Sequence, residues 1–211
     1  MDFTRAITYV FREPNWIKKI LITGLITIIP FLGFIYLIGW IAETVDRYQK
    51  NNYPLLPEKP SFSFFINGLK LGIAGIIYWL PLLLIRVLIE IVTRFWVYLF
   101  SGFLERAGIS LFEFMSSALT FIYFFFFLLL VPCILKIYLE RRNIRDTFEF
   151  RRIYQALRSN INTYVSLLLS IIICIIIASV GISLFYIGLI FTIPFAAAIY
   201  AHLVGQSIRH Y

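Results

Sequence analysis

The sequence predicts an all-α fold, a polytopic membrane helix bundle with about five to six membrane segments and two interfacial amphipathic helices. Apolar residues make up 61% of the 211 residues and charged residues 14%, whereas a soluble domain holds roughly 45–50% and about 25%. Runs such as Ile20–Ile29, Phe121–Val131 and Leu167–Ile177 carry no charge at all. A water-soluble core could not hide this much apolar surface, so these segments must lie in lipid.

The chain opens with a short amphipathic segment, residues 3–16. Arg5 and Arg12 stand beside apolar positions there, and Trp16 comes at the end. This pattern is typical of a helix that lies flat in the membrane interface. We expect Trp16 to lie at headgroup depth, where tryptophan is enriched.

Residues 17–45 form the first apolar segment, and Pro30 and Gly33 interrupt it in the middle. As a single helix this segment would be about 43 Å long, which exceeds the hydrocarbon thickness of about 30 Å, while either half alone is too short to cross. One tilted span and a broken or re-entrant hairpin with its tip at Pro30–Gly33 are both compatible with this length. The charges of the flanking loops decide between them.

The rest of the chain alternates basic loops with apolar spans, which are predicted at residues 71–92, 114–135, 164–182 and 185–204. Positively charged loops stay in the cytoplasm, so the net basic loop 46–70 and the strongly basic segment 136–158 both belong there. Residues 17–45 must then enter and leave on one face, which favours the hairpin. We therefore predict a multi-pass protein of the cell membrane with both termini in the cytoplasm.

The basic residues cluster beside the apolar spans, and segment 136–158 includes a second amphipathic stretch, Thr147–Leu157. Such a stretch favours a helix lying on anionic lipid, with docking to an acidic protein as the alternative. We expect the bilayer and its anionic headgroups as partners, and no nucleic acid. The residues expected to contact headgroups are Trp16, Lys18, Lys19, Arg141, Arg142, Arg145, Arg151, Arg152 and Arg158.

Soluble-enzyme motifs are absent from the sequence, which has no GxGxxG, GxxxxGK, HExxH or GxSxG pattern. The two cysteines, Cys133 and Cys174, lie in separate apolar runs without metal-ligand spacing, and His202 has no Cys, Asp or Glu at ligand spacing on its own helix. We therefore predict no catalytic residue, no cofactor and no metal site.

Arg86, Glu90 and Arg94 form the strongest polar feature within a predicted span. An ionisable residue inside a span costs about 2.5–3.5 kcal/mol and seldom stays unpaired. Their spacing of four residues places all three on one helical face. They form either one wall of a polar cavity for an anionic headgroup or substrate, or a neutralised pair, Arg86 with Glu90, that fixes helix packing.

Several short motifs follow one another along nearly the whole chain. The most specific are the runs PNWIKK at Pro14–Lys19 and IPFLGF at Ile29–Phe34. The further matching positions are Gly39-Trp40, Glu43, Pro54–Pro57, Gly68-Leu69, Tyr78, Pro81, Pro132 and Gly205-Gln206. In these motifs the chain resembles the membrane family of domain of unknown function 4013, although Lys59-Pro60 stands where an aromatic residue is expected. The resemblance implies the membrane fold and supplies no activity.

Three hypotheses for the function follow, of which the third, a membrane-embedded enzyme, would need a convergent nucleophile or metal set that the sequence does not offer. The first is a non-enzymatic accessory or scaffold component of a membrane assembly, whose partners are other membrane subunits or further copies of the chain. It is favoured because apolar residues rich in Phe and Ile leave few polar side chains for a transport path. The alternative is a transporter, channel or lipid-handling protein that uses the Pro30–Gly33 hairpin and the Arg86/Glu90 pair.

Overall fold

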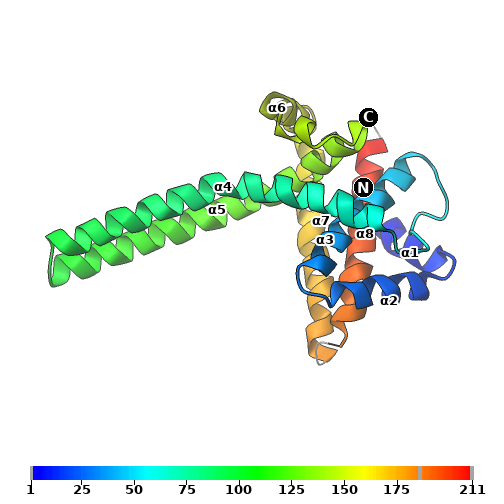
Figure 1. The fold of residues 1–211 in the computed structure, drawn as a ribbon, viewed down its shortest axis with the longest axis horizontal. Helices are drawn as coiled ribbons and strands as arrows, with labels where there is room; N and C mark the ends of the chain where they lie inside the picture. The colour runs from blue at the N-terminus through cyan, green and yellow to red at the C-terminus, as the bar shows by residue number, and fades with distance from the viewer. Residues whose placement is uncertain (1, 185–186, 210–211) are drawn as a thin grey trace. The chain divides into compact units, whose positions relative to one another are not determined.

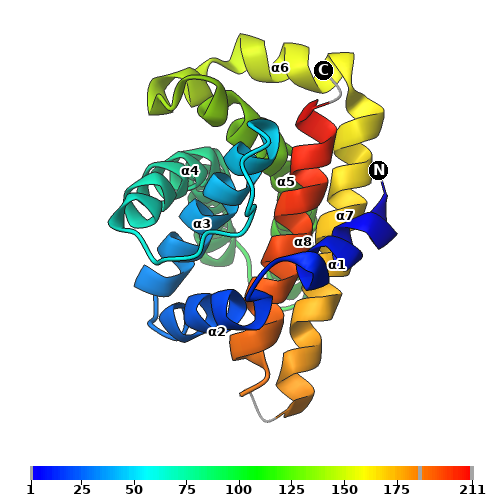
Figure 2. The same ribbon diagram turned by 90° about the vertical axis from the view of Figure 1, so that its right-hand side faces the viewer.

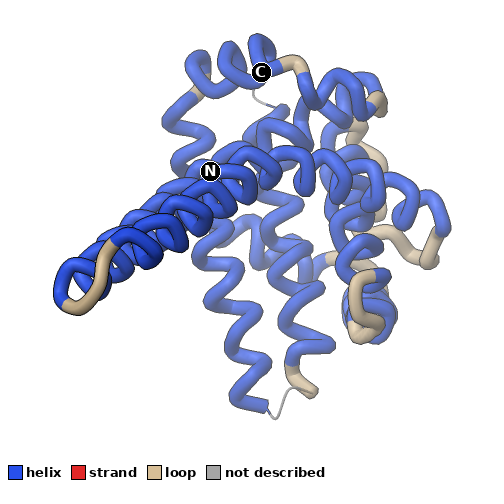
Figure 3. The backbone as a smooth tube through the Cα atoms, turned by 60° about the vertical axis from the view of Figure 1, so that its left-hand side comes forward, coloured by secondary structure: helices blue, strands red, loops and turns tan. Residues whose placement is uncertain are grey.

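The computed structural model describes residues 2–184 and 187–209, and this part of the chain contains eight α-helices and no strand (Figure 3). The all-α prediction is confirmed. The elements are α1 (Phe3–Arg12), α2 (Trp16–Thr27), α3 (Leu32–Gln49), α4 (Phe62–Leu99), α5 (Phe103–Arg141), η1 (Ile144–Phe148), α6 (Phe150–Ser159), α7 (Ile161–Ser179), η2 (Val180–Leu184) and α8 (Leu189–Arg209).

Four stretches are long and apolar enough to cross a membrane, and they identify the chain as a membrane protein. They are Phe62–Leu99, Phe103–Arg141, Ile161–Ser183 and Leu189–Ile208. The helices α4 and α5 run well beyond the predicted spans at both ends, because a charged residue ends an apolar run without ending a helix. For the same reason the irregular chain between α3 and α4 is shorter than the predicted loop 46–70. The predicted start of the last span, Phe185, lies outside the described residues.

The chain divides into two compact units. Unit 1 comprises Met1–Ala74 and Leu129–Tyr211, and unit 2 comprises Gly75–Leu128. The helices α4 and α5 each contribute to both units.

Helix α8 forms the centre of unit 1 (Figures 1 and 2). It packs against α7 and α3, while α1 and α2 lie across it. Its middle is rich in alanine, and side chains such as Ala198, Ile199 and Leu203 are fully buried. Small residues allow neighbouring helices to approach closely where lipid provides no hydrophobic driving force between them.

The segment predicted as a broken hairpin consists of two separate helices, α2 and α3. Thr27 ends α2 and Leu32 begins α3, so Pro30 lies in the break between them. Gly33 is the second residue of α3, where an added Cβ would lie 2.6 Å from the Cα of Thr27. Only glycine allows the start of α3 to approach the end of α2 this closely.

A second close approach joins α3 to the first part of α4 within unit 1. Gly39 and Gly68 face each other there. A Cβ on Gly39 would overlap the carbonyl oxygen of Phe64, and one on Gly68 would overlap that of Ile35. Gly72, one turn further along α4, has open space around it.

Unit 2 is an antiparallel helical hairpin (Figure 3). The turn follows Leu99 and ends at Gly102, whose positive φ of 68° suits glycine. Beside the turn, the indole nitrogen of Trp96 donates a hydrogen bond of 3.0 Å to the carbonyl of Leu104. At the other end, Trp79 packs against the ring of Phe127 at a centroid distance of 5.4 Å.

Candidate functional site

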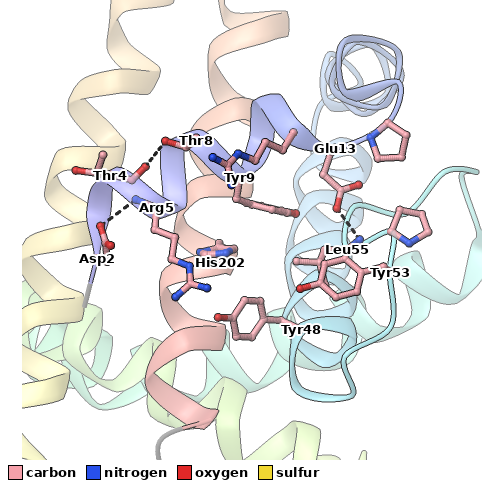
Figure 4. A pocket seen from close by; sticks show the side chains of 13 residues that line it. Asp2, Thr4, Arg5, Thr8, Tyr9, Glu13, Tyr48, Tyr53, Leu55 and His202 are labelled. Carbon is pink, nitrogen blue, oxygen red and sulfur yellow. Dashed lines mark hydrogen bonds between the residues drawn. The ribbon is translucent and has the colours of Figure 1, made fainter.

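A pocket of about 670 Å³ lies in unit 1, and we call it the N-terminal pocket (Figure 4). Helices α1, α3 and α8 and the chain after α3 all contribute to its walls. Its lining residues are Asp2, Thr4, Arg5, Thr8, Tyr9, Arg12, Glu13, Pro14, Tyr48, Tyr53, Pro54, Leu55 and His202. The pocket therefore joins three regions that are far apart in the sequence.

Helix α1 is held in place at its start by one side chain of α8. The carboxylate of Asp2 caps α1 by accepting a hydrogen bond of 2.9 Å from the Arg5 backbone N–H. The backbone N–H of Asp2 in turn donates to the Gln206 side-chain oxygen at 3.1 Å. The amphipathic helix predicted at residues 3–16 thus forms one wall of the pocket.

His202 lies between two tyrosines of the pocket. Its ring stacks on Tyr9 at 4.3 Å and meets Tyr48 edge-on at 4.8 Å. Because the Gln206 oxygen accepts from Asp2, its amide nitrogen faces Nδ1 of His202 at 3.1 Å. An amide nitrogen only donates, so Nδ1 accepts and the proton of the neutral ring is on Nε2.

A buried ion pair fixes the floor of the pocket. The carboxylate of Glu13 accepts from Nζ of Lys19 at 3.1 Å and from the Leu55 backbone N–H at 2.8 Å. Both charged side chains are less than 5% exposed. Lys19 therefore does not reach the headgroups as the sequence analysis expected, because a buried carboxylate requires a cation beside it. Lys18, its neighbour, is exposed.

Two cations of the pocket have no ionic partner. Within residues 2–184 and 187–209, the side chains of Arg5 and Arg12 form no ion pair and no hydrogen bond, and both residues are exposed.

The hydroxyl of Tyr9 is buried and also lacks a hydrogen-bond partner in this part of the chain. Burial, Glu13 and Tyr53 together raise the pKa of Tyr9, so its hydroxyl stays protonated and able to donate.

A second polar cluster in unit 1 links α3 to the chain after α5. Arg142 donates to Asp46 at 2.6 Å and to Glu43 at 3.5 Å, and Lys50 also pairs with Asp46 at 2.8 Å. Burial alone would lower the pKa of Arg142, but the two carboxylates outweigh it and leave the pKa raised. Arg47 joins the cluster through Glu43. Each of these three cations has a carboxylate partner within the cluster, so the cluster ties α3 to the chain after α5.

The other arginines expected at the headgroups divide into two groups. Arg141 lies 3.9 Å from Asp146, and Arg152 pairs with Glu149 at 3.1 Å. The second group, Arg145, Arg151 and Arg158, is exposed and forms no ion pair with any of the described residues. These three remain free to contact lipid.

Arg86, Glu90 and Arg94, which the sequence analysis assigned to a predicted span or its end, lie in unit 2, where a groove of about 520 Å³ separates the two helices. Arg86 and Glu90 line the groove together with Glu113 from α5. Glu90 pairs with Arg94 at 2.6 Å instead of with Arg86. Arg86 forms no ion pair within the described residues.

No metal site is found in the described ranges 2–184 and 187–209, where no three His, Cys, Asp or Glu side chains group together.

Comparison with known proteins gives one match. The model of a family described as "Protein of unknown function (DUF4013)" matches residues 22–187, which is more than half of the chain. The chain belongs to the DUF4013 family. No curated protein and no solved structure matches it.

The DUF4013 match covers all of unit 2 and only part of the N-terminal pocket. Tyr48 and Tyr53 lie inside the matched range, whereas α1 and His202 lie outside it. The basic, amphipathic character of α1 is visible in the sequence, where it predicts contact with lipid instead of a pocket wall. The contribution of Tyr48, Tyr53 and Glu13 to one pocket had no sequence signal, because it depends on how α3 and the following chain fold against α8.

Proposed function

We propose that this DUF4013 protein is a non-enzymatic component of a membrane assembly and that unit 2 contacts other membrane subunits. The proposal rests on the turn end of the hairpin, residues 86–113, which we call the docking end. It combines six charged side chains with strongly exposed aromatic rings. The adjoining stretches of the two helices, residues 71–85 and 114–128, carry no charge.

This distribution of charge separates two parts of the hairpin. The charge-free stretches suit the hydrocarbon core, whereas each charge of the docking end would cost about 2.5–3.5 kcal/mol at its centre. Helix α4 has 38 residues, so it is about 57 Å long and exceeds the hydrocarbon core of about 30 Å. The docking end therefore lies toward or beyond the membrane surface.

The aromatic side chains of the docking end are too exposed for a surface that faces water. Tyr98 and Phe103 are 86% and 82% exposed, and Phe95 is 61% exposed. Contiguous exposed apolar groups of this kind mark protein interaction sites, and interface cores are enriched in aromatic residues and arginine. A partner subunit or a second copy of the chain would cover them.

Photo-crosslinking tests this proposal in the intact membrane. A benzoylphenylalanine probe at Tyr98 or Phe103 is expected to form adducts with protein, and the adduct mass tells another subunit from a second copy. The matched control is the same probe at Phe121 or Ile122, which are 65% and 66% exposed in the charge-free stretch and should crosslink to lipid. Lipid adducts alone at both pairs of positions, with a purified protein that is monomeric, would overturn the proposal.

A transporter or lipid-handling role is a second candidate, favoured by the groove between the helices of unit 2. Substituting both Arg86 and Glu90 by Leu, with expression held constant, should abolish flux or lipid movement if the groove carries it. Arg106→Leu is the control, since Arg106 does not line the groove. Unchanged movement in the double variant would remove this role.

We also propose that both termini face the cytoplasm of the cell and that residues 17–45 form a re-entrant hairpin. Supporting this, α2 has only 12 residues and α3 reaches its first charged residue, Glu43, after 11 residues, both short of the roughly 20 apolar residues needed to cross. With Cys133 and Cys174 replaced, single cysteines at Asn52, Ala107 and Ser159 should label from outside at Ala107 alone. Labelling at Asn52 from outside would make residues 17–45 one ordinary span.

A further inference from the structure

We infer that the N-terminal pocket binds the phosphate group of an anionic ligand, with a lipid headgroup as the source that its position favours. This inference is independent of what the docking end contacts. It concerns unit 1 alone and follows from the charges and hydrogen-bond donors that the fold leaves unmatched in the pocket.

The charge of the pocket is positive once its internal pairs are counted. Glu13 is neutralised by Lys19, and the Asp2 carboxylate keeps its negative charge while it caps α1, so with Arg5 and Arg12 the balance is one positive charge. Arg5 and Arg12 remain unpaired within residues 2–184 and 187–209. Two guanidinium groups at one pocket suit a phosphate, whose oxygens accept their N–H donors in pairs.

Further donors face the same hollow. Figure 4 shows the Arg5 guanidinium, the His202 ring and the Tyr48 side chain close to one another, with Tyr9 above the His202 ring and Tyr53 to the right. The Nε2 proton of His202 is free to donate because the Gln206 amide occupies Nδ1. The buried hydroxyl of Tyr9 has no partner in the described chain, although a buried polar group normally has one.

The size and position of the pocket fit a headgroup. A volume of about 670 Å³ lies within the usual range of about 300–1,000 Å³ for small-molecule sites. Two of its walls come from an amphipathic helix, α1, and from the C-terminal part of an apolar helix, α8, which are elements of the membrane interface. Anionic headgroups are concentrated at such a surface, where basic residues attract them.

Binding of defined lipids to the purified full-length protein tests the inference. Native mass spectrometry in detergent would compare phosphatidylglycerol with phosphatidylcholine, and inorganic phosphate would be added as a competitor. The pocket variants are Arg5→Gln combined with Arg12→Gln, and Tyr48→Phe, which removes one hydroxyl and keeps the ring against His202. The control is Lys59→Gln combined with Lys70→Gln, which removes the same charge outside the pocket.

We expect the double pocket variant to bind phosphatidylglycerol at least about tenfold more weakly, because it loses charge-assisted hydrogen bonds. Tyr48→Phe should weaken phosphatidylglycerol binding about threefold. The control should weaken it less than about twofold, since surface charges outside the pocket contribute little. Failure of inorganic phosphate to displace the lipid would identify a lipid headgroup. Saturable phosphate binding that needs Arg5 and Arg12, without preference for the lipid, would identify a soluble phosphate compound.

Either of these results supports the pocket as a phosphate site. Equal phosphatidylglycerol binding by all variants, or an equal loss in the control and in the double pocket variant, would overturn it. Tyr48→Phe keeps the test decisive if the double variant has a lowered unfolding midpoint, because its single missing hydroxyl leaves the packing in place.

Discussion

The central helix of unit 1 and the two helices of unit 2 use their apolar side chains in opposite ways. In α8, 67% of the most apolar stretch is buried against other helices, whereas in α4 only 17% is. Unit 1 surrounds a central helix, holds a buried ion pair and encloses a pocket. Unit 2 is two helices in contact with each other, with most of their apolar side chains exposed.

This difference shows that apolar side chains in a membrane protein can either pack helices against one another or face lipid and partner proteins. In unit 1 close packing determines the structure, because alanine and glycine let the helices of the bundle approach. In unit 2 the backbone N–H and C=O groups form their hydrogen bonds within each helix, which is enough for a helix to be stable in lipid. The side chains therefore remain available to lipid or to a partner. Substitutions should therefore change stability in unit 1 and binding in unit 2.

The largest expected effect comes from breaking the buried ion pair of unit 1. Lys19→Met leaves the Glu13 carboxylate buried without a cation and should lower the free energy of unfolding by about 3–5 kcal/mol. Unfolding by SDS titration in mixed micelles measures it. The exposed neighbour gives the control, Lys18→Met, and the Glu13→Gln/Lys19→Met double variant should recover part of the loss. Equal effects at both lysines would contradict the buried position of Lys19.

Truncating one leucine in each unit tests the comparison directly. Leu203 is fully buried in α8, and Leu203→Ala should cost about 2–5 kcal/mol in the same titration. Leu84 of unit 2 is 65% exposed, so Leu84→Ala should change stability in detergent by less than about 0.5 kcal/mol. If the two variants lost the same stability, Leu84 would have to be packed in the isolated protein.

The close crossing of α3 and α4 offers a matched pair on one helix. In Gly68→Ala the new Cβ overlaps the backbone of α3, so about 1–3 kcal/mol of stability should be lost. Gly72→Ala meets nothing within 4 Å and should be neutral or stabilising by up to about 1 kcal/mol. Thermal unfolding followed by tryptophan fluorescence would show shifts of opposite sign. Two shifts of the same sign and size would argue against this crossing.

The smallest effect is expected at the turn of unit 2. Trp96→Phe removes the hydrogen bond to the Leu104 carbonyl, worth about 0.5–1.5 kcal/mol. Hydrogen exchange should become faster at residues 96–108 and stay unchanged in unit 1. Faster exchange throughout unit 1 would show that the two units unfold together.

Local features of the fold could be predicted well from the sequence. The break at Pro30 and the amphipathic first helix both have local causes, namely a missing backbone donor and the periodicity of apolar residues. The predicted lengths of α4 and α5 are too short, because hydropathy identifies the apolar segments that are stable in lipid and does not identify the residues at which a helix ends. Of the polar intramembrane residues, Arg86 and Glu90 do line one groove, but Glu90 pairs with Arg94.

The sequence by itself determined the membrane class, the all-α fold and the family. Composition and short motifs are local properties of the chain, which do not depend on how distant segments pack. Only the tertiary structure decided that Lys19 is buried while Lys18 is exposed, and that Arg5, Tyr48 and His202 share one pocket. Those outcomes depend on how α1, α3 and α8 pack. The sequence pattern of a helix shows that it has an apolar face, whereas the choice of its neighbour is made by shape and by the pairing of buried charges across the whole unit.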